Sequence, residues 1–556
     1  MSDWALRRAS TDALVALFGI ALVAAPVAGA AEAGAGTAAA APATLDSTAS
    51  LEGLPIARVD LEVHDIFVCQ AGDPFVSFYR LANALHIRTR DRTVRQQLLF
   101  APGERWSEER GAETARTLRS LDYLEPQRME ARRENDSVVV EVETRDAWTT
   151  SPLLNLERGG GVQYGTVGLT ERNLLGLGKA LSFQYHEDAI GIARSLTYRD
   201  PAVLGSRFQF SYGASSGTAG SSDILIAGQP FYAHDTPAAS QLAWRRARYV
   251  ASLFQSGGEI AELDVRNHES ELWAGIGRER HDGTIVRVIG SVFMLDRHLG
   301  PTRLEPGAPP DFAGGDEDLR LRRIAAEVRV WHPDFIVRED IERIGRKEDF
   351  DVGNSAALKL GYAPEFLGST ANEGYARGDA DVGGRLGRDF GYAHGSLSMR
   401  LRRGPLEVIR RLDARWNHKW RPGHVLVLSA FGMGGTDVQR DFQVVVGGLN
   451  GLRAYPVQAL AGTELVRLNA EQRWVLTRNR WDLVSLGMAA FYDAARAWGP
   501  GAVGTSWFNA AGLGVRFATP HSALSPVFRV DVAWPISPTR DGNREGVITF
   551  GSSQAF

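Results

Sequence analysis

The sequence contains a single cysteine, Cys69, among its 556 residues. No intrachain disulfide can therefore form, and metal sites built from several cysteines are excluded. A strongly basic balance is also absent, because 62 lysines and arginines stand against 66 aspartates and glutamates. The chain therefore lacks the charge of a nucleic-acid-binding protein, and we expect no nucleic-acid partner.

Long apolar runs and enzyme motifs are missing too. Beyond residue 30, no apolar run reaches the roughly 20 residues that a membrane-spanning helix needs. A membrane β-barrel is not excluded by this absence, because strands with alternating apolar and polar residues average to a low hydropathy. No Gly-x-Ser-x-Gly elbow, His-Glu-x-x-His pair or dinucleotide fingerprint occurs. We therefore predict no enzymatic activity, no catalytic residues, no cofactor and no metal site.

The first 55 residues resemble a targeting segment rather than a folded domain. Arg7 and Arg8 precede an apolar run, and the small residues Ala28, Gly29 and Ala30 follow it, which predicts a signal peptide over residues 1–30. The alternative, a membrane-anchoring helix, has a run that is short for about 30 Å of hydrocarbon. Residues 31–55 are rich in Ala, Gly and Thr, and we expect a flexible linker there.

Residues 56–148 are predicted to form a small α+β domain. Strand character at 56–67 and 137–142 flanks helical spacing at 93–99 and 107–121. One side of the longer helix is apolar, and the other is charged and expected to face water. The charged side carries Arg110, Glu113, Arg116 and Arg119.

Residues 151–556 alternate between apolar and polar side chains, which predicts β-strands. Near the C-terminus, for example, Phe528, Val530, Val532 and Trp534 oppose Arg529 and Asp531. The alternation alone fits either a membrane barrel or a soluble sandwich. For a barrel, strands of about ten residues predict about 16 strands. Residues 301–323 and 337–352 are the candidates for long external loops.

A lone arginine, Arg453, stands among glycines and aromatics in the run from Gly447 to Pro456. The next strand places Arg467, Asn469, Glu471 and Arg473 on one face. Further motifs follow in order, and with these they resemble the BamA/TamA family of outer-membrane assembly barrels. The motifs are Gly447-Gly448, Leu452-Arg453-Ala454-Tyr455, Glu471 with Arg473, Phe491-Tyr492-Asp493-Ala494-Ala495, Gly512-Leu513-Gly514-Val515-Arg516 and residues 548–556. The family carries glycine where Ala454 and Ala495 stand.

The resemblance implies a mostly β fold, a transmembrane antiparallel β-barrel over residues 151–556. Residues 56–148 resemble a polypeptide-transport-associated (POTRA) repeat, which implies a small α+β periplasmic domain in front of the barrel. It also implies that the loop of Arg453 folds into the lumen, where Arg453 meets Glu471 and Asp493. The lumenal motif is then Gly447, Gly448, Leu452, Arg453 and Tyr455, and the C-terminal strand signal is Phe550 and Phe556.

The function implied is assistance with the insertion, assembly or translocation of client proteins at the bacterial outer membrane. The expected partners are client outer-membrane or secreted polypeptides, the lipid bilayer and periplasmic partner proteins. A two-partner-secretion-type exporter and a passive pore or surface antigen without clients are the alternatives; a POTRA domain would be useless to a porin. We also expect the last strand to pair weakly with the first, near residues 161–169, which would let a client strand enter.

Overall fold

A computed structural model describes residues 50–552 and 554, except 71–72, 74, 160–161, 188–190, 449, 482, 503–505, 520, 522–526, 539–541 and 543. The predicted signal peptide, residues 1–30, and most of the predicted linker lie outside these residues. Within the described part of the chain, no helix is long and apolar enough to cross a membrane.

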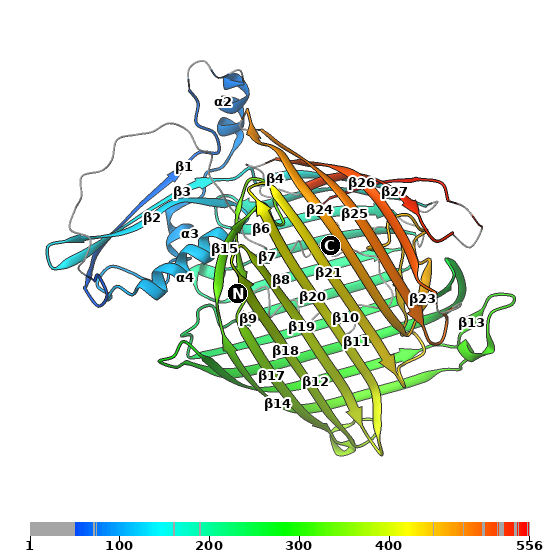
Figure 1. Cartoon of the computed structure of the whole chain (residues 1–556). Helices are drawn as coiled ribbons and strands as arrows, with labels where there is room; N and C mark the ends of the chain where they lie inside the picture. The colour runs from blue at the N-terminus through cyan, green and yellow to red at the C-terminus, as the bar shows by residue number, and fades with distance from the viewer. Residues whose placement is uncertain are drawn as a thin grey trace.

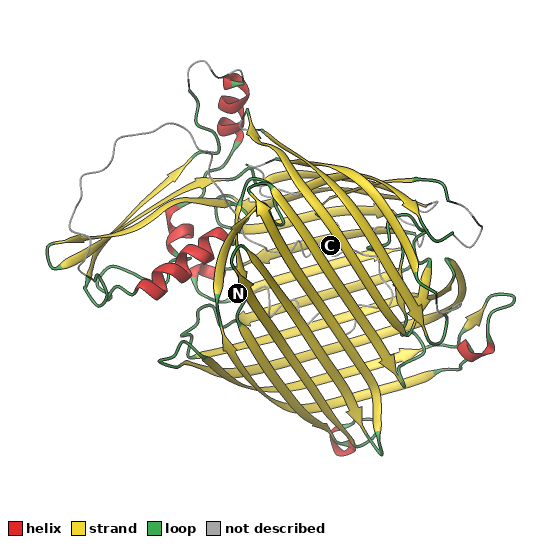
Figure 2. Ribbon diagram, viewed as in Figure 1, coloured by secondary structure: helices red, strands yellow, loops and turns green. Residues whose placement is uncertain are grey.

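The first folded part, which we call the N-terminal unit, is a three-stranded sheet with helices (Figures 1 and 2). The sheet order is β1-β3-β2, with β1 parallel and β2 antiparallel to the central β3. Leu118 of helix α4 packs with Val59 and Val140 of the sheet, which closes a small core. The elements are β1 (Ile56–His64), α2 (Val76–Leu85), α3 (Asp91–Arg95), α4 (Glu108–Arg119), β2 (Leu124–Glu134) and β3 (Ser137–Asp146).

The sequence predicted that the charged face of α4 faces water. In the structure, part of this face is covered. Glu113 is buried, and its Oε1 accepts the backbone N–H of His234 at 3.0 Å. Arg119 donates to both carboxylate oxygens of Asp349 at 2.6 and 2.7 Å. The prediction was wrong for these two residues because a second surface, the rim of the barrel, packs on that face of the helix.

The rest of the chain forms a closed barrel of antiparallel strands (Figure 1), which confirms the predicted fold class. β28 and β4 are neighbours and close the ring. The barrel strands are β4 (Thr150–Gly159), β5 (Val162–Leu174), β6 (Lys179–Glu187), β7 (Ile192–Asp200), β8 (Gln209–Gly217), β9 (Gly220–Gln229), β10 (Ala238–Gln255), β11 (Gly258–Glu279), β12 (Ile285–Leu299), β13 (Arg303–Leu304), β14 (Glu317–His332), β17 (Asn354–Ala363), β18 (Glu373–Leu386), β19 (Asp389–Leu401), β20 (Pro405–Arg421), β21 (His424–Thr436), β24 (Glu464–Arg480), β25 (Val484–Trp498), β26 (Phe508–Ala518), β27 (Val527–Pro535) and β28 (Val547–Ser552).

The prediction of about 16 strands was therefore too low. Apart from the two-residue β13, which pairs with β11 beyond the end of β12, and the six-residue β28, the ring consists of strands of at least nine residues. The prediction assumed long connections at one end of the barrel. In the structure, tight connections occur at both ends, for example from Gly217 to Gly220 and from Leu386 to Asp389. Short connections leave more of the chain for strands.

The two faces of the barrel wall differ in polarity. On β17, Leu358, Leu360 and Tyr362 are exposed on the outside. Between them, Lys359 points to the lumen, and its Nζ lies 2.5 Å from Oε1 of Glu271 on β11. An apolar exterior around a charged interior is the arrangement of a membrane barrel and the reverse of a soluble protein.

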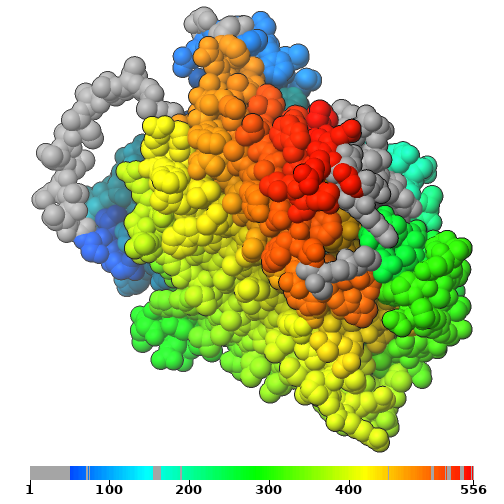
Figure 3. Space-filling model, turned by 45° about the vertical axis from the view of Figure 1, so that its right-hand side comes forward, coloured from blue at the N-terminus to red at the C-terminus, as the bar shows by residue number. Residues whose placement is uncertain are grey.

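One end of the barrel faces the N-terminal unit. The helices α2, α3 and α4 lie at this end (Figure 2), and α2 reaches the connection between β24 and β25 (Figure 3). There the hydroxyl of Tyr79 donates to the carbonyl of Trp481 at 2.5 Å, and the backbone N–H of Trp148 donates to the carbonyl of His521 at 2.7 Å. Such bonds tie the N-terminal unit to the barrel rim.

Two connections that were predicted as external loops lie at opposite ends. The connection from β12 to β14 carries β13 and the 3-10 helix η2 (Pro310–Phe312) and lies away from the N-terminal unit (Figure 1). The connection from β14 to β17 carries the two-stranded pair of β15 (Phe335–Glu339) and β16 (Lys347–Asp351) and contacts the N-terminal unit. The prediction for residues 337–352 was wrong because charge and turn content do not reveal the end of the barrel at which a loop lies.

The first barrel strand also begins earlier than predicted. β28 neighbours β4, whereas residues 162–169 belong to β5, the second strand. Residue 161 lies outside the described part. In β4, Pro152 and the adjacent Leu153 and Leu154 obscure the alternation that marks a half-buried strand.

Candidate functional site

The connection between β21 and β24, residues 437–463, folds into the barrel. It contains a small two-stranded sheet of β22 (Val444–Val446) and β23 (Leu460–Gly462) and a bridge between Gly448 and Leu452. Gly447 has a φ of 152°, and a Cβ there would lie 2.0 Å from the carbonyl oxygen of Pro456. This close approach admits only glycine, which explains the glycine at the start of the motif.

The apolar residues of the motif hold the loop against the inner wall. Leu452, Ala454 and Tyr455 are buried in one cluster with Phe491 and Ala495 of β25. The Tyr455 hydroxyl lies 2.8 Å from the carbonyl oxygen of Asn509 and 2.6 Å from that of Ser537, and its single proton is shared between these two acceptors. The two positions where the related family carries glycine, Ala454 and Ala495, therefore accommodate their methyl groups within this packed cluster.

Arg453 is fully buried and surrounded by carboxylates. Its Nε and Nη2 donate to the two oxygens of Asp493, both at 2.8 Å, and its Nη1 donates to Oε2 of Glu471 at 2.8 Å. The guanidinium also lies 3.3 Å from the centroid of the Phe491 ring. A planar cation with two parallel bonds to one carboxylate has a fixed orientation. The structure thus brings together the arginine and both carboxylates selected from the sequence.

A third carboxylate, Asp531 of β27, was not selected from the sequence. Its Oδ2 lies 3.4 Å from Nη1 of Arg453, and its Oδ1 accepts from Arg516 at 2.6 Å. A Cβ on Gly514 would lie 1.9 Å from that Oδ1, so the glycine makes room for the carboxylate. The alternation of β27 places Asp531 on the polar face, which was the available sequence signal, whereas its register opposite Gly514 is visible only in the structure.

Further arginines complete the cluster. Arg529 donates to Asp531 at 2.8 Å, and Arg473 donates to Glu471 at 2.8 Å. The carboxylates of Glu471, Asp493 and Asp531 have no exposed surface. Each of these acids contacts at least one arginine, and none of them can reach solvent. The arrangement suits the anchoring of a loop rather than chemistry on a substrate.

The C-terminal strand signal is only partly within the described residues. Phe550 is exposed on the outside of β28, as is Ile548 two residues earlier. Phe556 lies outside the described part of the chain. Exposed apolar residues on this short strand continue the apolar exterior of the barrel up to the seam with β4.

A second segment, residues 333–353 between β14 and β17, also packs against the inner wall. Ile336, Ile341 and Phe350 form a buried cluster with Phe390, Val425 and Val427. Val425 and Val427 stand opposite Arg473 and Glu471 in the register, so they share the lumenal face with them. This segment was not recognised in the sequence as part of the barrel interior.

The turn of this second segment is organised around Glu348. Its carboxylate accepts the backbone N–H groups of Ile341, Glu342 and Arg343 at 3.0, 2.9 and 3.1 Å. Burial raises the pKa of Glu348 to about 8, and the negative charge of Glu342 adds to the rise, while these N–H donors oppose it. Burial also lowers the pKa of Arg346 to about 10.

The same segment is tied to the N-terminal unit. Besides the Arg119–Asp349 pair, Arg346 pairs with Glu125, and Arg343 lies 3.4 Å from Asp122. The guanidinium of Arg116 lies 4.3 Å from the centroid of the Phe335 ring. The segment therefore has the inner wall on one side and the N-terminal unit on the other.

The two inward segments meet through Arg473. Its Nε binds Glu471, which also binds Arg453, and its Nη1 donates to the carbonyl of Ile341 at 2.7 Å. A continuous chain of buried contacts therefore runs from the tip of the loop 437–463 to the segment 333–353 inside the barrel.

A closed barrel with an apolar exterior, a charged lumen and an inward loop held by a buried arginine is a transmembrane-type β-barrel. The Omp85 superfamily domain matches residues 408–556, which include β20 to β28 and the whole Arg453 cluster. The resemblance read from the sequence is thereby confirmed at the level of the superfamily for this part of the chain.

The solved structures that are similar to this chain share little sequence identity with it. CdiB from Acinetobacter baumannii is 11% identical, with a TM-score of 0.44 over 90% of this chain and 74% of that one. CdiB from Escherichia coli is 12% identical, with a TM-score of 0.44 over 91% and 77%. BamA from Haemophilus ducreyi lacking POTRA domains 1-3 is 12% identical, with a TM-score of 0.37 over 89% and 84%. No curated protein sequence matches this chain.

Proposed function

We propose that the protein lies in the bacterial outer membrane and assists the insertion or assembly of client polypeptides there, with residues 56–148 as a POTRA-like domain in the periplasm. The observation that carries the proposal is the joint architecture. A membrane-type barrel with an Omp85 superfamily domain has its lumen occupied by two anchored segments, and a small sheet with an open edge lies at one end. A passive pore needs neither the occupied lumen nor the sheet.

The open edge is β2, which pairs only with β3 in the described sheet. An extended client segment can add to such an edge through backbone hydrogen bonds. β2 carries three arginines and three glutamates, so its charge favours clients of neither sign, and the backbone groups of the edge provide the binding. The other edge strand, β1, is less accessible, because Arg95 donates to the carbonyl of Val59 at 3.3 Å.

The proposed route into the membrane is the seam between β28 and β4. β28 has only six residues, Val547–Ser552, so it can form only a short ladder with its neighbour β4, whereas β10 has 18 residues and pairs with β11 along its whole length. Because a short ladder has fewer hydrogen bonds to break, this seam opens at the lowest cost. Export through the lumen is the alternative function, and it requires both inward segments to leave.

Photo-crosslinking in intact cells tests the proposal. A photoreactive residue at Gln127 or Arg133 on β2 should trap nascent outer-membrane or secreted polypeptides. The same residue at Arg92, which is exposed on α3, is the matched control and should trap few. The proposed client-handling role would be wrong if all three positions trapped the same amount of polypeptide. It would also be wrong if none of the trapped polypeptides were outer-membrane or secreted proteins.

A further inference from the structure

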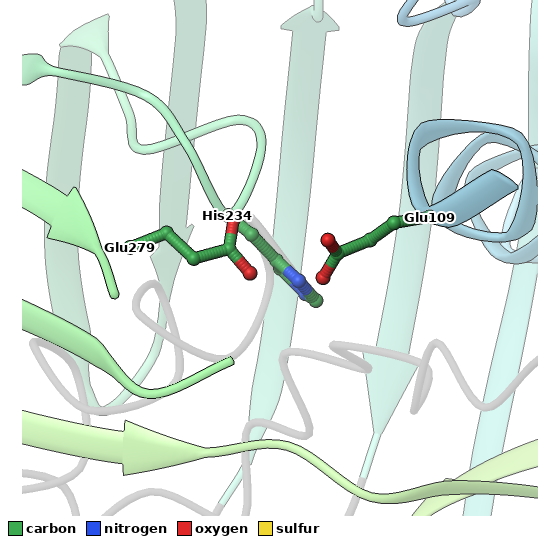
Figure 4. A group of neighbouring side chains, drawn as sticks. All are labelled: Glu109, His234 and Glu279. Atoms are coloured by element: carbon green, nitrogen blue, oxygen red, sulfur yellow. The ribbon is translucent and has the colours of Figure 1, made fainter. Parts of the chain in front are cut away.

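Three side chains from separate parts of the chain converge where the N-terminal unit meets the barrel rim (Figure 4). Glu109 lies in α4, His234 lies in the connection between β9 and β10, and Glu279 ends β11. One oxygen or nitrogen atom of each lies within 4.8 Å of the other two. The imidazole of His234 lies between the two carboxylates (Figure 4).

His234 is an unusual histidine, because it is 3% exposed and neither ring nitrogen has a hydrogen-bond partner among the described residues. Its nearest acid, Glu113, lies 3.6 Å from Nε2, too far for a hydrogen bond. Oε1 of Glu279 is also buried without a hydrogen-bond partner in the described structure, although the Glu279 carboxyl group interacts with that of Glu109. Buried polar atoms normally have hydrogen-bond partners, so these two ring nitrogens and this carboxylate oxygen indicate a bound ligand.

The surroundings fix the orientation of the ring. Trp331 packs edge-on against it at 5.1 Å and Phe335 stacks at 6.3 Å, while the backbone N–H of His234 donates to Glu113. The neutral imidazole is the form of histidine that binds metals. Arg116 and Arg287 add positive charge to the same region, which limits the affinity without occupying the donor atoms.

We propose that Glu109, His234 and Glu279 bind a divalent transition metal ion of the Zn²⁺ type at this junction. One imidazole and two carboxylates are a donor set that zinc accepts, at about 2.0–2.2 Å per bond, with water completing the coordination. Mg²⁺ and Ca²⁺ prefer sites made only of oxygen atoms. The exposed side chain of Glu109 can move the remaining distance toward the ion.

The consequence is a metal link between the N-terminal unit and the barrel. Glu109 belongs to α4, whereas His234 and Glu279 belong to the barrel rim. Beside them Arg110 of α4 pairs with Asp235 at 2.5 Å. The bound ion therefore holds α4 on the rim at the place where the helix also reaches the segment 333–353.

The test uses the full-length protein in detergent with Cys69→Ser, because the exposed thiol of Cys69 could itself bind zinc. Zn²⁺ is titrated by calorimetry, and Co²⁺ by its visible absorption. One ion per chain is expected, and Glu109→Gln and Glu279→Gln should each weaken binding by about tenfold or more. His281→Gln, an exposed histidine two residues beyond Glu279, is the control and should bind as before.

A second measurement tests whether the bound ion connects α4 to the barrel rim, in addition to binding at the site. Zn²⁺ should slow backbone hydrogen exchange in α4 of the parent protein but not of Glu109→Gln, whose exposed position poses little risk to folding. No saturable Zn²⁺ binding, binding by both glutamine variants as tight as by the parent protein, or tighter binding of Ca²⁺ than of Zn²⁺ would each overturn the proposal.

Discussion

The two segments that fold into the barrel are held in different ways. The loop 437–463 is anchored to the barrel and not to the N-terminal unit in the described contacts: the buried Arg453 cluster holds it to β24, β25 and β27, and Arg440 holds it to the β12–β14 connection. The segment 333–353 is anchored on two sides, to the wall through Ile341 and Phe350 and to the N-terminal unit through Asp349. The first is therefore a fixed part of the barrel, whereas the second can follow a movement of the N-terminal unit.

Arg473 is the point at which this difference matters. It joins Glu471 of the fixed cluster to the backbone of Ile341 in the second segment. A displacement of the segment 333–353 removes one partner of Arg473 but leaves its ion pair with Glu471. The fixed loop can therefore remain in place while the second segment opens. The predictions below test this asymmetry.

The largest effect is expected from Arg453→Ala. Removal of the guanidinium leaves Asp493, Glu471 and Asp531 buried with less compensation, and breaking a buried pair costs about 3–5 kcal/mol. Arg467→Ala is the control, because Arg467 donates to a carbonyl, that of Asn450 at 3.0 Å, lies 5.2 Å from the centroid of the Phe431 ring, and retains partial exposure. The measurement is the temperature at which the folded barrel band is lost in a heat-modifiability gel.

In the same assay, the loss of each carboxylate should lower the unfolding temperature according to how closely that carboxylate binds Arg453. Asp493→Asn should lower that temperature more than Asp531→Asn, since Asp493 binds Arg453 through both oxygens at 2.8 Å and Asp531 lies at 3.4 Å. Equal temperatures for Arg453→Ala and Arg467→Ala would show that the loop is not anchored through this cluster.

The second prediction removes the other segment. Replacing residues 335–351 by a short Gly-Ser turn should raise the single-channel conductance in planar bilayers, because it uncovers the lumen next to Phe390 and Val427. Shortening the connection that carries the 3-10 helix η3 (Glu365–Leu367), at the opposite end, is the matched control. An unchanged conductance after the first replacement would mean that the loop 437–463 closes the lumen alone.

Features that depend on neighbouring residues could be predicted from the sequence, whereas features that depend on distant residues could not. Alternation within a strand is local, and it identified the polar face that carries Asn469, Glu471 and Arg473. The placement of Glu471 and Asp493 beside Arg453 came from the resemblance to a family, since only tertiary structure brings a loop tip to a wall. Asp531 was not among the residues that the resemblance implied, so it was not predicted to meet Arg453, although the alternation placed it correctly on the polar face.

The failures concern surfaces that only the assembled chain creates. Residues 337–352 were expected outside, because nothing in a loop sequence indicates which end of a barrel it occupies. Glu113 was expected in water, because its partner, the backbone of His234, comes from a distant connection. Glu109, His234 and Glu279 have no motif spacing, so a sequence scan for metal ligands could not group them.

The third prediction uses the pH dependence of Glu348. Its pKa is raised from 4.5 to about 8 in the folded protein, so its contribution to stability is present below about pH 4.5 and is lost as the pH rises through about 8. Trypsin should therefore cleave at Arg343, Arg346 and Lys347 about tenfold faster at pH 8.5 than at pH 6.5, after normalisation to a free peptide. Glu348→Gln should abolish most of this ratio, whatever its effect on the rate itself. A ratio that survives the substitution would assign the pH dependence to another group.

The smallest effect is expected where the second segment meets the N-terminal unit. The pair of Arg119 and Asp349 has two bonds at 2.6 and 2.7 Å but remains partly exposed, so it contributes about 1 kcal/mol. Arg119→Ala should speed hydrogen exchange of residues 335–351 by about fivefold, which is the same free energy. Asp349→Asn should do the same, and the double variant should add little, because both changes remove one interaction. Arg133→Ala, on the exposed part of β2, is the control. Fully additive effects in this cycle would mean that Arg119 does not hold the segment, and a movement of the N-terminal unit would then have to reach it through Arg346 and Glu125.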